Sequence, residues 1–210
     1  MKRFLFLAYV GVGLVLPLSA FAATNFVDMF MGGGTTAVSG QYSGWNYGSQ
    51  PYDVYNSNVA TSTSTFYFVF GMDYSWVLNH QHTFWMGIGS TLSLAFPSSG
   101  SVSPETISLD VPFEYLLSTR FSVVVKPSIL GIWMPGELTN YYSTDLFGIG
   151  FSISAGPAYY FDDHENIGVC LLAGYKYLPT SCTNDDGTKT TFAGGGFYAS
   201  VYFSFELWSD

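Results

Sequence analysis

The stretch STFYFVFGMDYSW, Ser64 to Trp76, carries a large apolar side chain at every second position. One face consists of Phe66, Phe68, Phe70, Met72, Tyr74 and Trp76, and the other of Tyr67, Val69, Gly71, Asp73 and Ser75. Such strict alternation is typical of a β-strand whose two faces meet different surroundings. In a soluble protein the first face would form the core, whereas in a membrane barrel it would contact lipid.

The composition favours contact with lipid. The chain has 210 residues, enough for one domain of moderate size. Only 10% of the residues are charged and 19% are aromatic, whereas ordinary soluble domains have about 25% charged residues. A soluble protein needs more charge than this to cover its surface. The shortage therefore predicts a lipid-facing exterior.

The N-terminus has the three parts of a secretory signal peptide. Lys2 and Arg3 form the positive region, and the apolar stretch FLFLAYVGVGLVLPL follows them. Ala20 and Ala22 then occupy the small-residue positions of a cleavage site. We expect a signal peptide over residues 1–22 and a mature domain over residues 23–210. A retained N-terminal membrane anchor is the alternative.

The charge of the mature chain argues against nucleic acid as a partner. Without the signal peptide, four basic residues stand against fifteen acidic ones, and binding of phosphate groups requires clustered Lys and Arg. The mature chain also lacks the run of about 18 apolar residues that a transmembrane helix needs. If it enters a membrane, it must do so as a closed barrel, because lipid does not tolerate open sheet edges.

The alternation recurs along the mature chain. Eight segments show it: residues 25–33, 64–76, 83–96, 106–117, 120–133, 146–161, 167–176 and 196–208. Several fit the roughly 9–11 residues with which a tilted strand crosses a bilayer. Their second faces consist mainly of Gly, Ser, Thr and Ala, which suit the narrow interior of an eight-stranded barrel. We predict an all-β fold, an eight-stranded antiparallel up-and-down transmembrane β-barrel with its large apolar faces toward lipid.

The connections between these segments alternate in length. Short turns are expected at residues 77–82, 118–119 and 162–165, and longer connections at 35–63, 97–104, 134–144 and 179–189. Short periplasmic turns and longer outer loops are typical of outer-membrane barrels. We therefore expect both termini in the periplasm and the longer loops outside the cell.

Three prolines fall inside the predicted strands: Pro112, Pro127 and Pro157. Each lacks the N–H group of a ladder hydrogen bond, and a closed barrel has no edge strand to accommodate it. We interpret all three as β-bulges. The alternation continues past them without a change of phase.

The last segment contains the most specific motif of the chain, FYASVYFSFELW, which ends at Trp208. It resembles the C-terminal assembly signal of small eight-stranded bacterial outer-membrane β-barrels of the OmpA-barrel, OmpX and OmpW type. Those signals usually finish on the aromatic residue, whereas Ser209 and Asp210 follow it here. The resemblance implies an outer-membrane location, with the lipid bilayer and the barrel-assembly machinery as partners.

The histidines are the natural candidates for catalysis. Some barrels of the resembling type are lipid A acyltransferases or deacylases, whose His acts with a Ser near the outer leaflet. His80, His82 and His164 fall in predicted short turns instead, and a metal site built from them with Asp162 is a weak alternative. We predict no catalytic residue, no metal site and no cofactor. An outer-membrane lipid-modifying enzyme is a remote alternative.

The two cysteines are Cys170 and Cys182. An oxidising compartment would permit a disulfide between them. However, Cys170 is predicted low in the seventh segment and Cys182 in the loop beyond its top. At ~3.3 Å per residue the strand is too long for that loop to bring them within the ~7 Å of a disulfide. We expect no intrachain disulfide.

The interior charges suggest a gate. Counting outward from the turn at residues 118–119 places Asp110 almost opposite Lys126, both toward the interior. An unpaired buried lysine would be costly, so we predict an ion pair that closes the lumen. The periplasmic half below it holds Asp28, Asp73, Glu114 and Glu206. Because crowded carboxylates in a dry space would be forced toward protonation, we interpret this half as a wet acidic vestibule. Above it, the lumen is expected to be narrowed by Tyr160, Tyr198 and Tyr202.

The longest predicted loop is rich in Tyr, Ser, Asn and Gly. This composition favours adaptable recognition surfaces, and it also describes an ordinary flexible loop. Its candidate contact residues are Tyr42, Trp45, Tyr47, Tyr52 and Tyr55. We favour a structural or surface-interaction barrel whose loops meet an extracellular ligand. A narrow cation-preferring channel for small solutes, opened at the predicted gate, is the alternative.

Overall fold

A computed structural model provides the structure of the chain. It describes residues 25–43, 59–96, 104–134, 145–161, 167–183 and 189–209. The predicted signal peptide lies outside these residues. No helix within the described ranges is long and apolar enough to cross a membrane.

All regular structure in the described ranges is β-strand. The strands are β1 (Asn25–Ser43), β2 (Val59–Val77), β3 (Phe84–Phe96), β4 (Glu105–Asp110), β5 (Phe113–Ser118), β6 (Phe121–Met134), β7 (Leu146–Tyr160), β8 (Ile167–Tyr177), β9 (Thr180–Thr183) and β10 (Lys189–Ser209). β4 and β5 form one crossing interrupted at residues 111–112, and β8 and β9 form another interrupted at 178–179. The ten strands therefore make the eight predicted crossings.

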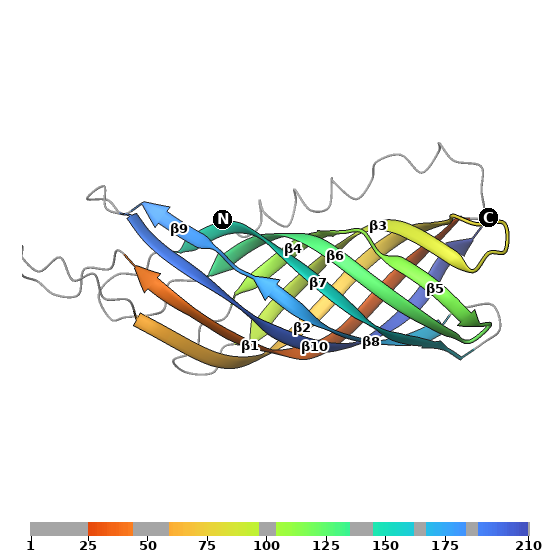
Figure 1. The fold of residues 1–210 in the computed structure, drawn as a ribbon, viewed down its shortest axis with the longest axis horizontal. Coiled ribbons are helices and arrows are strands. Elements are labelled where there is room, and N and C mark those ends of the chain that lie inside the picture. Colours follow the sequence, from red (N-terminus) through yellow and green to blue (C-terminus); the bar gives the residue numbers. More distant parts are fainter. Residues whose placement is uncertain are drawn as a thin grey trace, which may run out of the picture.

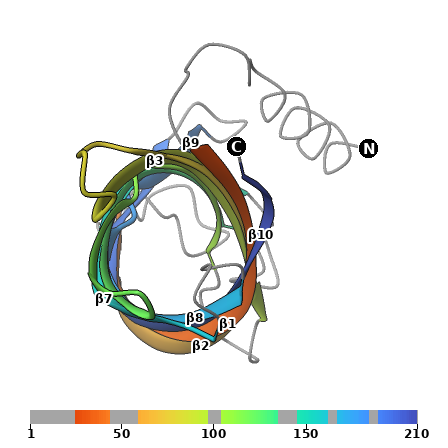
Figure 2. The same ribbon diagram turned by 90° about the vertical axis from the view of Figure 1, so that its right-hand side faces the viewer.

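The sheet closes on itself. Each crossing pairs antiparallel with the crossings before and after it, and β1 pairs with β10 over almost its whole length. The strands run side by side at a slant to the long axis (Figure 1), and the view along that axis shows them as a ring (Figure 2). The predicted all-β, antiparallel up-and-down barrel is confirmed.

The two faces are assigned as predicted. In β2, Phe66 is 70% exposed on the outside, whereas its neighbour Tyr67 is 4% exposed and lies inside. Each crossing exposes large apolar side chains, for example Met31, Phe68, Leu94, Leu109, Ile129, Ile149, Leu171 and Phe203. The small and polar faces line the interior. Phe66, Phe68 and Phe70 of the stretch Ser64–Trp76 thus form part of the outer wall.

Some strands extend further than predicted. β1 continues to Ser43 and β2 begins at Val59, so the connection between them is shorter than the predicted loop at residues 35–63. β9 and the start of β10 likewise occupy part of the predicted loop at 179–189. The lipid-facing pattern of alternate large apolar residues stops near Thr35, whereas main-chain pairing continues beyond it. The sequence pattern shows the alternation of large apolar residues, but it does not show how far the main-chain pairing extends.

The bulge interpretation is wrong for all three prolines. Pro127 and Pro157 lie in β6 and β7 with no register shift between those strands. Pro112 lies in the gap between β4 and β5, where Asp110 faces Ser128 and Phe113 faces Val125 in one unchanged register. Pro127 faces the same gap, and its carbonyl accepts a hydrogen bond from Val111. Two residues without N–H groups are thus adjacent across one interruption of the ladder.

Candidate functional site

The lumen changes character along its length. We call the end where β1 begins and β10 ends the short-turn end, and the opposite end the long-loop end. The inward positions of β6, starting from the short-turn end, are Ser122, Val124, Lys126, Ser128, Leu130, Ile132 and Met134. A polar cavity, an ion cluster and an apolar layer follow one another in this order.

The ion cluster lies in the middle of the lumen. The ammonium Nζ of Lys126 lies 3.0 Å from Oδ2 of Asp73 and 3.2 Å from Oδ2 of Asp110. It also lies 4.1 Å from the centroid of the Phe30 ring on β1. Since β6 and β1 are on opposite sides of the ring of strands, the Lys126 side chain extends across the lumen. The predicted gate residues Asp110 and Lys126 are therefore in contact.

Neighbouring residues hold the two carboxylates in place. The Thr91 hydroxyl donates a hydrogen bond to Asp110, which is almost completely buried. Asp73 lies against Gly89 on β3, where an added Cβ would be 1.7 Å from Oδ1 of Asp73. Only glycine therefore leaves room for the carboxylate in this position. The cluster has one ammonium group and two carboxylates.

Asp73 lines the cavity described below, as predicted, and it also takes part in the ion cluster. Asp73 lies in the short-turn half of β2 by sequence count, but it contacts Lys126 in the ion cluster. The strands of a barrel are tilted and staggered, so equal counts from a strand end do not give equal heights on opposite walls. The sequence count ignored this stagger and missed the second carboxylate of the cluster.

A polar cavity lies between the ion cluster and the short-turn end. Its volume is about 70 Å³, and its lining includes Asp28, Trp85, Glu114, Tyr160 and Cys170. Glu114 accepts hydrogen bonds from the hydroxyls of Ser122 and Tyr160. A polar space of this size can hold several water molecules, which need about 10–15 Å³ each by the same measure.

The remaining predicted vestibule residues lie at or near this cavity. Asp28 lines it, and Glu206 is half-buried directly opposite Asp28 on β10. Asp28 also faces Asp73 across the β1–β2 ladder. Asp73 and Glu114 line the cavity as well, so all four predicted carboxylates lie at or beside it.

The three predicted constriction tyrosines lie at different heights. Tyr202 packs against Phe30, with ring centroids 5.4 Å apart, and Tyr198 belongs to the same buried cluster. Tyr160 lies at the end of β7 and bonds to Glu114 beside the cavity. The prediction that Tyr160 narrows the lumen above the vestibule is wrong, because β7 ends at the short-turn end.

Two inward residues were missed as site residues, Lys176 on β8 and Tyr67 on β2. The Nζ of Lys176 lies 4.5 Å from the ring centroid of Tyr67 and 4.6 Å from that of Tyr198. Lys176 is 8% exposed. The alternation already placed it inside, so an inward lysine without an assigned carboxylate was a signal that could have been followed.

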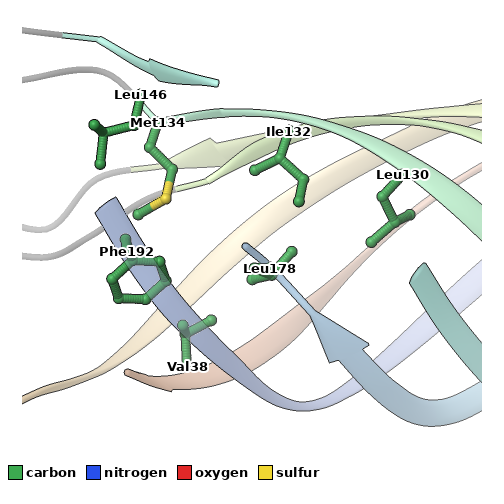
Figure 3. Packing of buried hydrophobic residues seen from close by; sticks show 7 residues of the cluster. All are labelled: Val38, Leu130, Ile132, Met134, Leu146, Leu178 and Phe192. Atoms are coloured by element: carbon green, nitrogen blue, oxygen red, sulfur yellow. The ribbon is translucent and has the colours of Figure 1, made fainter. Parts of the chain in front are cut away.

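An apolar layer lies in the long-loop half of the lumen, where Thr65, Thr106 and Thr180 are also buried. It is formed by Val38, Leu130, Ile132, Met134, Leu146, Leu178 and Phe192. Figure 3 shows these side chains converging from several strands, and each is at most 4% exposed. The sequence analysis missed this layer because Leu146 begins a predicted segment, while Leu178 and Phe192 fall outside the segments altogether.

The other predicted positions do not form a second site among the described residues. Tyr42 lies on β1 rather than in a loop, and Trp45, Tyr47, Tyr52 and Tyr55 lie outside the described residues. His80 and His82 are exposed in the turn between β2 and β3, where His82 has a positive φ of 56°. His164 lies outside the described residues. Within them, no group of three or more His, Cys, Asp or Glu side chains could hold a metal ion.

The two cysteines lie at opposite ends of one crossing. Cys170 is buried at the cavity, and Cys182 lies on β9, where it packs against the apolar layer. Neither cysteine forms a disulfide in the structure. Placing Cys182 in a loop was wrong, because β9 continues the line of β8 and pairs with β10.

No protein-family model matches the sequence, and no curated protein does. Several solved structures are similar to this chain in fold. The crystal structure of Neisserial surface protein A (NspA) is 12% identical, covers 86% of this chain and 98% of its own, and has a TM-score of 0.47. The outer membrane protein OprG from Pseudomonas aeruginosa is 10% identical, with coverages of 88% and 98% and a TM-score of 0.48. The outer membrane protease OmpT from Escherichia coli is 9% identical, with coverages of 91% and 99% and a TM-score of 0.44. These similarities concern the fold alone.

Proposed function

We propose that this chain is an outer-membrane β-barrel with a closed lumen, which acts through its outer surface and its long-end loops. The observation that carries the proposal is the filling of the lumen at three successive heights. The ion cluster spans it from β6 to β1 and β2. Tyr67, Tyr198 and Lys176 contact one another beyond this cluster. The apolar layer then packs together residues of β1, β6, β7 and β10 in the long-loop half.

The outer wall supports a lipid environment. Phe66, Ile149 and Phe197 are each at least 70% exposed and come from β2, β7 and β10. A continuous apolar belt of this kind would be an aggregation site in water, and lipid is the solvent that suits it. We place the long-loop end outside the cell and both termini in the periplasm, following the usual arrangement of short and long connections. The barrel-assembly machinery would then recognise the chain through its last strand.

The apolar layer is the main obstacle to conduction. Lining atoms without polar groups cannot replace the hydration shell of an ion, and narrow apolar constrictions exclude water. The closest packing is around Leu178 and Phe192, which are at most 1% exposed. An ion would have to displace this layer to leave the polar half of the lumen at the long-loop end.

Single-channel recording tests the closed lumen. The purified full chain is reconstituted in planar bilayers, and current is recorded at several voltages. The salt is roughly 1 M KCl, because high salt weakens electrostatic barriers to ions and so raises the conductance. We expect no steady current. Regular current steps of the size of a wide porin would contradict the proposal.

The alternative is a narrow cation-preferring channel gated by Asp110 and Lys126, and the acidic cavity is the observation that favours it. The variant Lys126→Ala separates the two functions. A gated channel would open more often and become more cation-selective in the variant. A lumen closed by the apolar layer stays closed, since that layer does not include Lys126.

A surface-interaction role is tested by deletion of residues 42–55, whose composition favours recognition. Cells that display the wild type and the deletion variant at equal density are compared for attachment to surfaces coated with extracellular-matrix protein. Reduced attachment of the deletion variant would support a contact role. Equal attachment would leave the barrel with a structural role.

A further inference from the structure

Lys176 differs from the other buried lysine in the partners it has. Lys126 contacts two carboxylates. Lys176 is equally buried, but its ammonium lies between the ring faces of Tyr67 and Tyr198. Among the described residues, no carboxylate forms an ion pair with Lys176, and Asp110 is already bound to Lys126 and Thr91. Aromatic faces attract a cation without cancelling its charge.

The position of Lys176 along the lumen gives this charge a consequence. The inward positions of β8 and its continuation, from the short-turn end, are Cys170, Leu172, Gly174, Lys176 and Leu178. Cys170 lines the polar cavity and Leu178 belongs to the apolar layer. Along this wall Lys176 therefore lies between the cavity and the apolar layer.

The two levels of the lumen consequently act on ions in opposite directions. The carboxylates Asp28 and Glu114 at the cavity attract cations. The charge of Lys176 repels them at close range, in surroundings where screening by water and salt is weak. An anion that reached this level would be attracted instead.

We propose that Lys176 is a selectivity-determining residue, which bars cations from the long-loop half of the lumen and favours small inorganic anions such as chloride. The inference rests on the proposed closed lumen and specifies which ions, cations or anions, the lumen excludes more strongly. It predicts that an opening through the apolar layer passes anions in preference to cations as long as Lys176 is present. It also reverses the cation preference expected from the acidic residues.

The experiment uses the full chain with the apolar layer thinned by Leu130→Ala and Phe192→Ala. The reversal potential is measured in planar bilayers under a KCl gradient, and variants are made in this background. Lys176→Met removes the charge at nearly constant size, and Lys176→Arg keeps it. Lys189→Met removes the same charge from an exposed position at the start of β10. Circular dichroism verifies the strand content of each protein.

We expect the thinned barrel to be anion-preferring and Lys176→Met to shift the anion-to-cation permeability ratio toward cations by roughly tenfold, as a charge at close range implies. Lys176→Arg and Lys189→Met should leave the ratio unchanged. An unchanged ratio in Lys176→Met would overturn the inference, as would an equal shift in Lys189→Met. Absence of current from folded Lys176→Met would also overturn it, because the barrier would then lie elsewhere. A porin-like current in the unmodified chain contradicts the closed lumen instead, whatever Lys176 does.

Discussion

The two halves of the lumen are enclosed by one continuous wall and are filled by different means. The short-turn half contains a cavity with carboxylates, hydroxyls and an ion cluster, whereas the long-loop half contains seven packed apolar side chains. Polar groups in the first half need specific partners, because an unpaired buried charge is costly. Side chains in the second half need only matching volume. The same barrel thus combines a part that depends on exact pairing with a part that depends on packing.

The sharpest test of this contrast removes the central cation. Lys126→Met should lower the free energy of unfolding by about 3–5 kcal/mol, because it leaves Asp73 and Asp110 buried without a counter-charge. Urea unfolding in lipid vesicles, followed by tryptophan fluorescence, measures the loss. The triple variant with Asp73→Asn and Asp110→Asn should recover most of it. If the triple variant is as unstable as Lys126→Met, the cost comes from packing and the contrast fails.

The apolar half should respond to volume. Phe192→Ala should cost about 3–4 kcal/mol, because it opens a cavity among fully buried side chains. Phe192→Leu fills most of that space and should cost less than about 1.5 kcal/mol. The same unfolding assay applies. Equal losses for the two variants would show that the site does not depend on side-chain volume.

The contrast between inside and outside should be visible at two consecutive residues of β7. Phe151 is exposed on the lipid side and Ser152 is buried in the lumen. Phe151→Arg should cost about 2–4 kcal/mol near the middle of the bilayer. Ser152→Asn should cost much less, because the interior already holds polar groups. Losses of similar size would indicate that the two faces are assigned the wrong way round.

The smallest effect is expected at the cavity. Tyr160→Phe removes one hydroxyl from Glu114, which keeps its hydrogen bond to Ser122. A lost hydrogen bond to a charged group costs about 1.5–3 kcal/mol when the group stays dry. Because water can enter the cavity and replace the hydroxyl, we expect about 1 kcal/mol at most. A loss above this range would show that the cavity is dry.

The strands of the barrel and their two faces were predictable from the sequence, whereas much of the side-chain arrangement in the lumen was not. Alternation identified the eight crossings and their two faces, since it reports directly which side of a strand contacts lipid. The tight turn at residues 118–119 fixed the β5–β6 register, and with it the proximity of Asp110 and Lys126. Neither signal contains the tilt of the strands, so the contact between Asp73 and Lys126 was not predicted. The position of Lys176 between two rings depends on three strands that are distant in sequence.

At the long-loop end of the barrel, the strands continue beyond the part whose outer face carries large apolar residues. Beyond the lipid-facing part of β1, the outer face carries Thr35, Ala37 and Ser39, which give no pattern of large apolar residues. The ladder nevertheless extends to Ser43. Likewise Phe192 lies in the early part of β10, which none of the predicted segments included. The apolar layer was missed because its members come largely from such strand ends.

The pairing of β1 with β10 also constrains how the protein can reach this structure. The hydroxyl of Thr36 bonds to the carbonyl of Phe197, a separation of 161 residues, so the first strand gains its second partner only after the last strand has been made. Until then both strands present open edges, which lipid does not tolerate and which readily pair with other chains. Contacts this distant in sequence form slowly. The barrel therefore has no stable half, and its biogenesis requires that both edges be protected until the two ends of the chain meet.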